Sequence, residues 1–262
     1  MKDILKEIAS NKKREVNALF SHSLRGVVSA AAREGVKKNY SMVESLRQRT
    51  GGIIAEFKRR SPSKGDIFPM AAIESVIPGY VAGGAGACSV LTDTRFFGGS
   101  PADLAVAYEL AGEIPLLRKD FIVDEVQIEE ARVLGASTVL LIASILERDE
   151  LEGFNSLAHE LGMETLVEIH DRWELEKLRF TPDLLGVNNR NLDTFHTDVN
   201  HSLDLVGSLP KDSLLVAESG IRDAEDIMRL KDAGFEAFLV GEALMSDPDP
   251  GEALARMIEK LK

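Results

Sequence analysis

The chain has 262 residues, of which 44% are hydrophobic and 28% charged, a composition typical of a globular protein that buries a substantial core. Its formal net charge of −12 argues against general binding to nucleic acid or acidic membranes, so any site for an anion must be locally positive. The single cysteine, Cys88, excludes an internal disulfide and a thiolate metal cluster, and no apolar run reaches transmembrane length.

The first fifty residues are predicted to form a helical extension. Apolar side chains recur there at helical spacing in two short runs, Ile4, Leu5 and Ile8, and then Val16, Leu19 and Phe20. The opening stretch MKDILKEIASNKKREV lacks the unbroken apolar core of a signal peptide, so we expect a protein of the reducing cytoplasm. We interpret residues 1–262 as one domain, with residues 1–50 as an extension packed on it.

Eight short apolar runs follow, and each precedes a helix-like segment. The runs occupy residues 51–58, 87–93, 114–120, 137–144, 164–170, 183–189, 213–219 and 236–241. They are mostly continuous rather than alternating, as expected of strands covered on both faces. Eight evenly spaced strand–helix units predict an α/β fold, a (β/α)₈ TIM barrel. An open doubly wound sheet is the alternative, but no GxGxxG follows the first strand.

Chargeable and amide side chains stand at the ends of most predicted strands. The set comprises Glu56 and Lys58 in the first, Lys119 in the third, Glu168 in the fifth, Asn188 in the sixth and Glu218 in the seventh. Because the carboxyl ends of the strands form the active site of such barrels, these side chains are expected to converge on one mouth. Acids and lysines placed close together acquire separated pKa values, which suits general acid and base catalysis.

The stretch EFKRRSPSKGD, Glu56 to Asp66, carries four positive charges in an acidic chain. It is open to three interpretations: a nucleic-acid patch, a solvated loop, or a site for an anionic small molecule. Strand alternation places Glu56 and Lys58 on one face, in the barrel interior. Arg59 and Arg60 are interpreted as solvated rim residues, and salt-dependent nucleic-acid binding is expected to be absent.

Two loops near the end of the chain predict a phosphate site. ESGI follows the seventh strand and VGEALM the eighth, where barrels of this type recurrently bind phosphate. Gly220 and Gly241 would let backbone N–H groups approach the anion, although tight turns alone would also need glycine. The five histidines show no metal-ligand spacing, so no metal is expected, and His170 is a minor candidate for substrate contact.

Seven ordered motifs together resemble the indole-3-glycerol phosphate synthase family of tryptophan biosynthesis, in its monofunctional form. They are IIAEFKRRSPSKGDI, SVLTDTRFFGGS, PLLRKDFIVDEVQIEEA, LVEIH, GVNNRNLDTF, VAESGI and FLVGEALM. The resemblance implies a carbon–carbon lyase that uses neither cofactor nor metal. Its substrate would be 1-(2-carboxyphenylamino)-1-deoxyribulose 5-phosphate, which is closed, decarboxylated and dehydrated to indole-3-glycerol phosphate, carbon dioxide and water.

The same resemblance implies catalytic roles for six of these residues. Lys119 is the general acid for ring closure and Glu168 the general base. Lys58 and Glu56 are also catalytic, and which pair drives the dehydration stays open. Asn188 and Glu218 orient the sugar hydroxyls and the lysines.

Binding roles are implied for eight more residues. Ser61 and Arg190 would hold the carboxylate end, and Phe97 and Phe121 would line the aromatic pocket. Phosphate would meet Lys58 and the loops that carry Ser219, Gly220, Gly241 and Glu242. Because Glu242 stands where relatives often have a small hydroxyl residue, only its backbone N–H is expected to serve phosphate, with its carboxylate pointing away.

A phosphosugar isomerase on the same barrel is the alternative function. Such isomerases share the phosphate-binding loops but lack the combination of Lys119 with SPSKG. Either function implies a small phosphorylated substrate, with no nucleic-acid or membrane partner. Members of the family are often monomers, and the sequence leaves the oligomeric state of this chain open.

Overall fold

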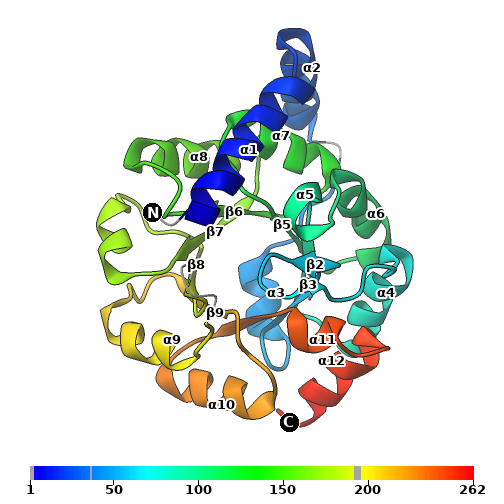
Figure 1. The fold of residues 1–262 in the computed structure, drawn as a ribbon, viewed down its shortest axis with the longest axis vertical. Coiled ribbons are helices and arrows are strands. Elements are labelled where there is room, and N and C mark those ends of the chain that lie inside the picture. The colour runs from blue at the N-terminus through cyan, green and yellow to red at the C-terminus, as the bar shows by residue number, and fades with distance from the viewer. Residues whose placement is uncertain (1–2, 36, 192–195) are drawn as a thin grey trace.

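The computed structural model describes residues 3–35, 37–191 and 196–262. Residues 1, 2 and 36 of the predicted extension lie outside these ranges, as do the last four residues of the motif GVNNRNLDTF. Within the described residues, eight parallel strands close into a barrel in the order β1-β10-β9-β8-β7-β6-β5-β4. Helices surround the barrel (Figure 1), so the prediction of a TIM barrel is confirmed.

Each barrel strand lies within one of the eight apolar runs of the sequence. The strands are β1 (Ile53–Phe57), β4 (Ala87–Leu91), β5 (Leu116–Lys119), β6 (Thr138–Ile142), β7 (Glu164–Ile169), β8 (Leu184–Asn188), β9 (Leu214–Glu218) and β10 (Ala237–Val240). The runs are continuous because one face of each strand meets the helices and the other meets the barrel interior. A small antiparallel pair that the sequence did not predict follows β1, formed by β2 (Arg60–Ser61) and β3 (Gly65–Asp66).

The outer helices begin and end at residues suited to those positions. The outer helices are α4 (Ile73–Gly83), α6 (Pro101–Ala111), α7 (Glu125–Leu134), α8 (Arg148–Glu160), α9 (Asn200–Leu205), α10 (Ala224–Ala233) and α12 (Pro250–Glu259), with the short α5 (Thr94–Phe97), η1 (Arg172–Lys177), η2 (Val206–Ser208) and α11 (Glu242–Met245). The Asp124 side chain accepts a hydrogen bond from the Val126 N–H and so caps α7. Gly135 ends that helix with φ of 102°, a left-handed conformation that glycine adopts without steric cost.

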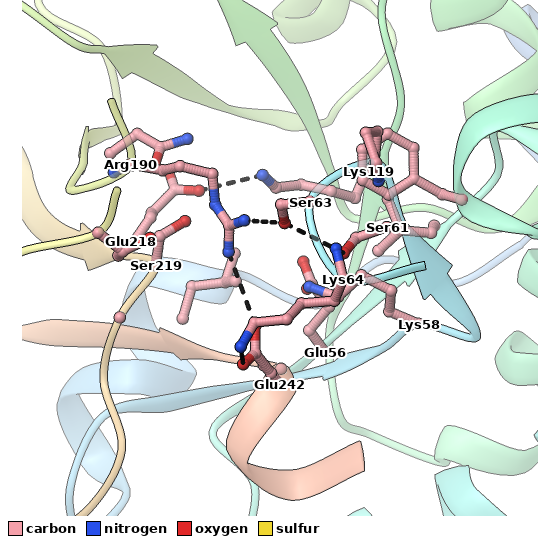
Figure 2. Close-up of a pocket in the computed structure, with 18 of the residues that line it drawn as sticks. Glu56, Lys58, Ser61, Ser63, Lys64, Lys119, Arg190, Glu218, Ser219 and Glu242 are labelled. Atoms are coloured by element: carbon pink, nitrogen blue, oxygen red, sulfur yellow. Dashed lines mark hydrogen bonds and ion pairs between the residues drawn. The ribbon is translucent and has the colours of Figure 1, made fainter. Parts of the chain in front are cut away.

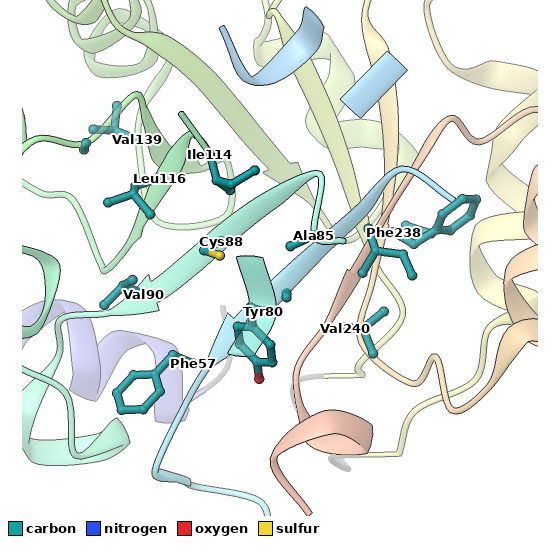
Figure 3. Packing of buried hydrophobic residues seen from close by; sticks show 14 of the residues in the cluster. Phe57, Tyr80, Ala85, Cys88, Val90, Ile114, Leu116, Val139, Phe238 and Val240 are labelled. Carbon is teal, nitrogen blue, oxygen red and sulfur yellow. The ribbon is translucent and has the colours of Figure 1, made fainter. Parts of the chain in front are cut away.

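Alternate residues of each strand enter two separate cores. The outward side chains of β1 and β4, such as Phe57 and Val90, pack with Tyr80 of α4 between strands and helices (Figure 3). Cys88 belongs to this outer core, where complete burial raises the pKa of its thiol to about 12 and leaves it unreactive. The inward side chain Ile54 belongs to the core that fills the barrel, which places the next inward residue, Glu56, toward the mouth.

Three helices precede the barrel, α1 (Asp3–Leu19), α2 (His22–Glu34) and α3 (Met42–Gln48). Of these, α3 closes the amino-terminal end of the barrel. Met42 and Leu46 enter the interior core, and the Ser45 hydroxyl donates to the Gly86 carbonyl at 2.6 Å. The Glu164 carboxylate, at the start of β7, accepts hydrogen bonds from the backbone N–H groups that begin α3.

The first helix, α1, reaches the opposite end of the barrel through Lys12. This side chain is almost completely buried, with 1% exposure, and its Nζ lies 3.0 Å from a carboxylate oxygen of Asp93 and 3.0 Å from one of Asp120. Asp93 lies two residues after the end of β4, and Asp120 directly follows β5. Burial disfavours the ammonium ion, but Asp120 and then Asp93 outweigh burial and raise the pKa of Lys12 above its usual range. In Figure 1, α1 runs from the barrel toward α2, which projects beyond the outer helices.

Replacing Lys12 with methionine should remove the shared cation while preserving much of the side chain's volume. Because the buried carboxylates of Asp93 and Asp120 then lose this cation, although Asp120 keeps Arg118, we expect the free energy of unfolding at pH 7 to fall by about 3 kcal/mol. Urea unfolding followed by circular dichroism measures this change.

The loss should also depend on pH. Pairing holds the pKa of Asp120 below its usual value, so it contributes stability at neutral pH that disappears as pH falls through the lowered pKa. The difference between Lys12→Met and the unmodified protein should therefore shrink in acid. The exposed neighbour Lys13 supplies the control, Lys13→Met, and equal destabilisation by both variants would contradict the assignment.

Candidate active site

The carboxyl ends of the strands surround a cavity of about 950 Å³. All fourteen residues assigned above to catalysis or substrate binding line this one cavity. They come from nearly every strand because strand alternation turns the last inward residue of each toward the mouth. His170 is buried outside the lining, with its Nε2 3.4 Å from a carboxylate oxygen of Glu168.

At the centre, the Lys119 ammonium group lies between two carboxylates. Its Nζ is 3.2 Å from Glu168 Oε2 and 3.1 Å from Glu218 Oε2, and Figure 2 shows the contact with Glu218. The three residues take inward positions on β5, β7 and β9. Burial alone would lower the pKa of Lys119, but Glu218, Glu168 and the more distant Glu56 raise it above its usual range. Lys119 is therefore held in its protonated form over the physiological pH range.

The two carboxylates differ in protonation although both are buried. Burial disfavours the ionised form of Glu168, but Lys119, then His170 and a hydrogen bond with Asn188, lower its pKa below the usual value. Burial raises the pKa of Glu218 to about 8, because its effect outweighs the opposing charge of Lys119 and the Glu168 carboxylate raises the pKa further. The pKa values of these two coupled acids are thus shifted in opposite directions, a separation that suits acid–base catalysis.

A second pair of charges lies at the end of β1. Lys58 Nζ is 2.5 Å from Glu56 Oε1, and both side chains face the cavity, as the alternation of β1 predicts. Gly241, at the end of the neighbouring strand β10, makes room for this pair, because a Cβ there would overlap the Glu56 carboxylate. The glycine therefore leaves space for the Glu56 carboxylate at the mouth of the cavity.

The loop after β9 has a sharply turned backbone. Ser219 has φ of 68°, the only positive value at a non-glycine position among the described residues, and Gly220 follows with 77°. Asn189 stabilises this turn, since its Nδ2 donates to the Ser219 carbonyl at 3.1 Å. A side chain at Gly220 would also collide with the Thr197 methyl group. Tight turns of this kind present neighbouring backbone N–H groups to an anion.

Charged residues from three loops meet at the rim of the cavity (Figure 2). Lys64, between β2 and β3, lies 3.1 Å from Glu242 Oε1, while Arg190, after β8, lies 3.8 Å from Glu242 Oε2. Arg190 Nη1 also donates to the Ser63 hydroxyl, and the Ser61 hydroxyl accepts from the Lys64 N–H at 3.2 Å. The expectation that the Glu242 carboxylate points away from the site is wrong, because these two cations attract it across the rim.

One wall of the cavity is apolar. The rings of Phe97 and Phe121 lie 5.9 Å apart between centroids, with an interplanar angle of 36°. Leu5 and Ile8 of α1 extend this wall, which the sequence interpretation missed. Their helical spacing was visible in the sequence, but nothing local indicated which surface they would face.

The positively charged residues of EFKRRSPSKGD make different contacts in the structure. The Arg59 guanidinium binds both carboxylate oxygens of Asp103, at 2.6 and 3.0 Å, and donates to the Ala71 and Gly98 carbonyls. Its interpretation as a solvated rim residue is therefore wrong, since it fastens this segment to α6. Arg60 is exposed as expected, and its Nε lies 3.4 Å from Asp66 Oδ1.

Among the residues that the structure describes, no group of three His, Cys, Asp or Glu side chains could hold a metal ion. None of the described helices is both long and apolar enough to cross a membrane.

Comparison with known proteins gives one consistent result. The family described as indole-3-glycerol phosphate synthase matches residues 5–257. The indole-3-glycerol phosphate synthase of Bacteroides thetaiotaomicron is 46% identical, with all of both chains covered. That of Laribacter hongkongensis is 42% identical over 98% of this chain and 99% of the relative.

Solved structures with a similar fold have much lower identity. The 3-hexulose-6-phosphate synthase of Salmonella typhimurium has a TM-score of 0.60 at 14% identity, covering 80% of this chain and 99% of that one. A chain of the tryptophan synthase complex from Pyrococcus furiosus has a TM-score of 0.56 at 14% identity, covering 81% and 98%. These likenesses support the barrel fold alone.

The Lys119 arrangement makes a prediction about protonation. Replacing Lys119 with methionine removes the charge that opposes burial at Glu168, so the pKa of Glu168 should rise above its ordinary value. Carboxyl-selective NMR titration of ¹³C-labelled glutamate measures this change. A pKa of Glu168 that stays low in the Lys119→Met variant would show that another group keeps it ionised.

Proposed function

Because the chain belongs to the indole-3-glycerol phosphate synthase family, we propose that this cavity is where it closes, decarboxylates and dehydrates 1-(2-carboxyphenylamino)-1-deoxyribulose 5-phosphate. The chain is an enzyme of tryptophan biosynthesis, a carbon–carbon lyase that forms indole-3-glycerol phosphate, carbon dioxide and water. The observation that carries the assignment of the site is the protonated Lys119 between Glu168 and Glu218, within reach of both an apolar wall and anion-binding loops.

The shape of the cavity suggests one orientation of the substrate. The phosphate would bind at the Ser219–Gly220 turn and at the backbone of Gly241 and Glu242, near Lys58. The aromatic ring would pack on Phe97 and Phe121, which already lie side by side. Its carboxylate would then face Arg190 and Ser61 on the rim. The ketone between these ends would lie near Lys119, at the centre of the cavity.

Ring closure needs a proton at the ketone oxygen. The aromatic carbon that bears the carboxylate attacks the ketone carbon, and Lys119 transfers its proton to the developing alkoxide. Glu168 and Glu218 hold the ammonium group in position and stabilise its charged form. The bond to the carboxylate then breaks, its electron pair returns to the ring, and carbon dioxide leaves.

Dehydration completes the indole and needs both an acid and a base. The hydroxyl group formed in the first step leaves as water after protonation, while a base removes a proton from the adjacent ring carbon. We assign the base to Glu168, because Lys119 and His170 oppose the effect of burial and lower its pKa. Lys119 and the Lys58–Glu56 pair both face the cavity as sources of the proton, and their separate variants distinguish them.

Other aspects of the function are also proposals. Residues 1–262 would act as one domain, since Leu5 and Ile8 of the extension line the same cavity as the catalytic groups. A monomer would suffice, because described residues of one chain supply the whole lining. The buried free thiol of Cys88 supports a reducing compartment, the cytoplasm. No observation favours the alternative, a phosphosugar isomerase.

Turnover tests the assignment of Lys119. In Lys119→Met, the proton donor for ring closure is absent, so kcat should fall by about 100-fold or more. Incubation with the anilino-ribulose phosphate and detection of indole fluorescence measures it. The exposed Lys231 of α10 supplies the matched control, Lys231→Met. Near-normal turnover without Lys119 would refute its role as the acid.

Gly186 provides a second test, because it lies inward on β8 beneath the catalytic groups. A Cβ there would overlap Glu218 Oε1 and come within 3.2 Å of the Leu166 side chain. The Gly186→Ala variant should therefore displace Glu218 from Lys119 and lower kcat by about 100-fold. Gly153 of α8, where a Cβ meets open space, supplies the control Gly153→Ala. Unchanged kcat in a folded Gly186→Ala protein would show that the position of Glu218 is unimportant.

A further inference from the structure

Every lysine and arginine in the described lining of the cavity already has a carboxylate partner. The pairs are Lys58 with Glu56, Lys64 with Glu242, Lys119 with Glu168 and Glu218, Arg190 with Glu242, and Arg222 with Asp226. The substrate of the proposed reaction carries a phosphate and a carboxylate. Its anionic groups can therefore gain a full cationic partner only where one of these carboxylates gives way.

Burial decides which carboxylate can move. The side chains of Glu56, Glu168 and Glu218 are only 5%, 5% and 1% exposed, so none has water into which its charge could turn. Glu242 differs, because 39% of its side chain is exposed at the rim. Half-exposed ion pairs are weak and their partners are easily rehydrated. Displacing the Glu242 carboxylate from its cations therefore costs less free energy than displacing Glu56, Glu168 or Glu218.

Displacement of the Glu242 carboxylate would change the contacts between two loops at the rim. Its two oxygens meet cations from different loops, with Oε1 3.1 Å from Lys64 Nζ and Oε2 3.8 Å from Arg190 Nη2. Arg190 also binds the Ser63 hydroxyl, so the loop between β2 and β3 is held to the rim opposite it (Figure 2). A ligand that binds Lys64 and Arg190 in place of Glu242 would therefore replace the contacts that Glu242 makes between the loops.

We propose that the Glu242 carboxylate is a displaceable counter-ion, which occupies Lys64 and Arg190 in the free enzyme and yields them to the anionic groups of the substrate. This inference rests on the proposed function for the identity of the substrate. It makes Glu242 a specificity-determining residue. A small anion that displaces the Glu242 carboxylate gains only one new contact with a cation. A substrate with two separated anionic groups gains more than one such contact.

The experiment compares the unmodified enzyme with Glu242→Gln, which keeps the backbone N–H and nearly the same shape but loses the competing charge. The Kd of inorganic phosphate, measured by calorimetry, should fall about three- to tenfold. KM for the anilino-ribulose phosphate should also fall, but by less than the Kd of phosphate. Glu252 of α12, which is exposed and outside the cavity, supplies the control Glu252→Gln.

A double-mutant cycle tests whether Glu242→Gln changes the phosphate Kd by freeing Lys64. In a Lys64→Met background one of the two contested cations is gone, so the gain from Glu242→Gln should shrink. An unchanged phosphate Kd in Glu242→Gln would overturn the proposal. A raised KM with lowered kcat would also overturn it, since Glu242 would then hold the loop in its productive position.

Different measurements test the proposed function and the role of Glu242. An unmodified enzyme that does not convert the anilino-ribulose phosphate would refute the proposed function. The phosphate Kd of Glu242→Gln would still decide whether its carboxylate competes with anions for Lys64 and Arg190.

Discussion

A charge that leaves water must find a partner, and this constraint organises the upper end of the barrel. The strands direct Glu56, Lys119, Glu168 and Glu218 to positions at the base of the cavity where little of each side chain is exposed to water. There the charges are paired with one another and with Lys58. The interior below them is apolar, so the polar groups form one layer above a packed core. The geometry of the site thus follows from the need to pair these charges as much as from the strands that carry them.

The same constraint explains how the site differs from the rest of the molecule. Lys12 pairs with Asp93 and Asp120 in an arrangement that leaves all three side chains almost completely buried, and Arg118 also pairs with Asp120. Lys119, the residue next to Arg118 on β5, faces the cavity together with its partners Glu168 and Glu218. Arg118 and Lys119 therefore pair with different carboxylates, because alternation sends adjacent residues of a strand to opposite sides.

The extent to which sequence predicts this structure follows from the range of each interaction. The eight strands and the inward direction of Glu56 and Lys58 were predictable, since a continuous apolar run and a period of two are local properties. The fourteen site residues were identified from motifs, and all of them line the cavity. The pairing of Lys12 with Asp93 and Asp120 was not predicted, because it depends on where α1 lies after the barrel has closed. Gly186 was overlooked for the same reason, since the group it makes room for belongs to another strand.

The direction of the Glu242 side chain shows how a motif can identify a position and still mislead about its chemistry. By resemblance, only the backbone of this residue was expected to matter, so its carboxylate was expected to turn away. In the folded chain it faces Lys64 and Arg190, whose unpaired charges would otherwise repel each other and the loops that carry them. A site for an anion must stay assembled in the absence of that anion. A carboxylate at the rim satisfies this requirement, at the cost of some affinity for the ligand. A fully buried carboxylate would also keep the site assembled, but it could not move into water when the ligand binds.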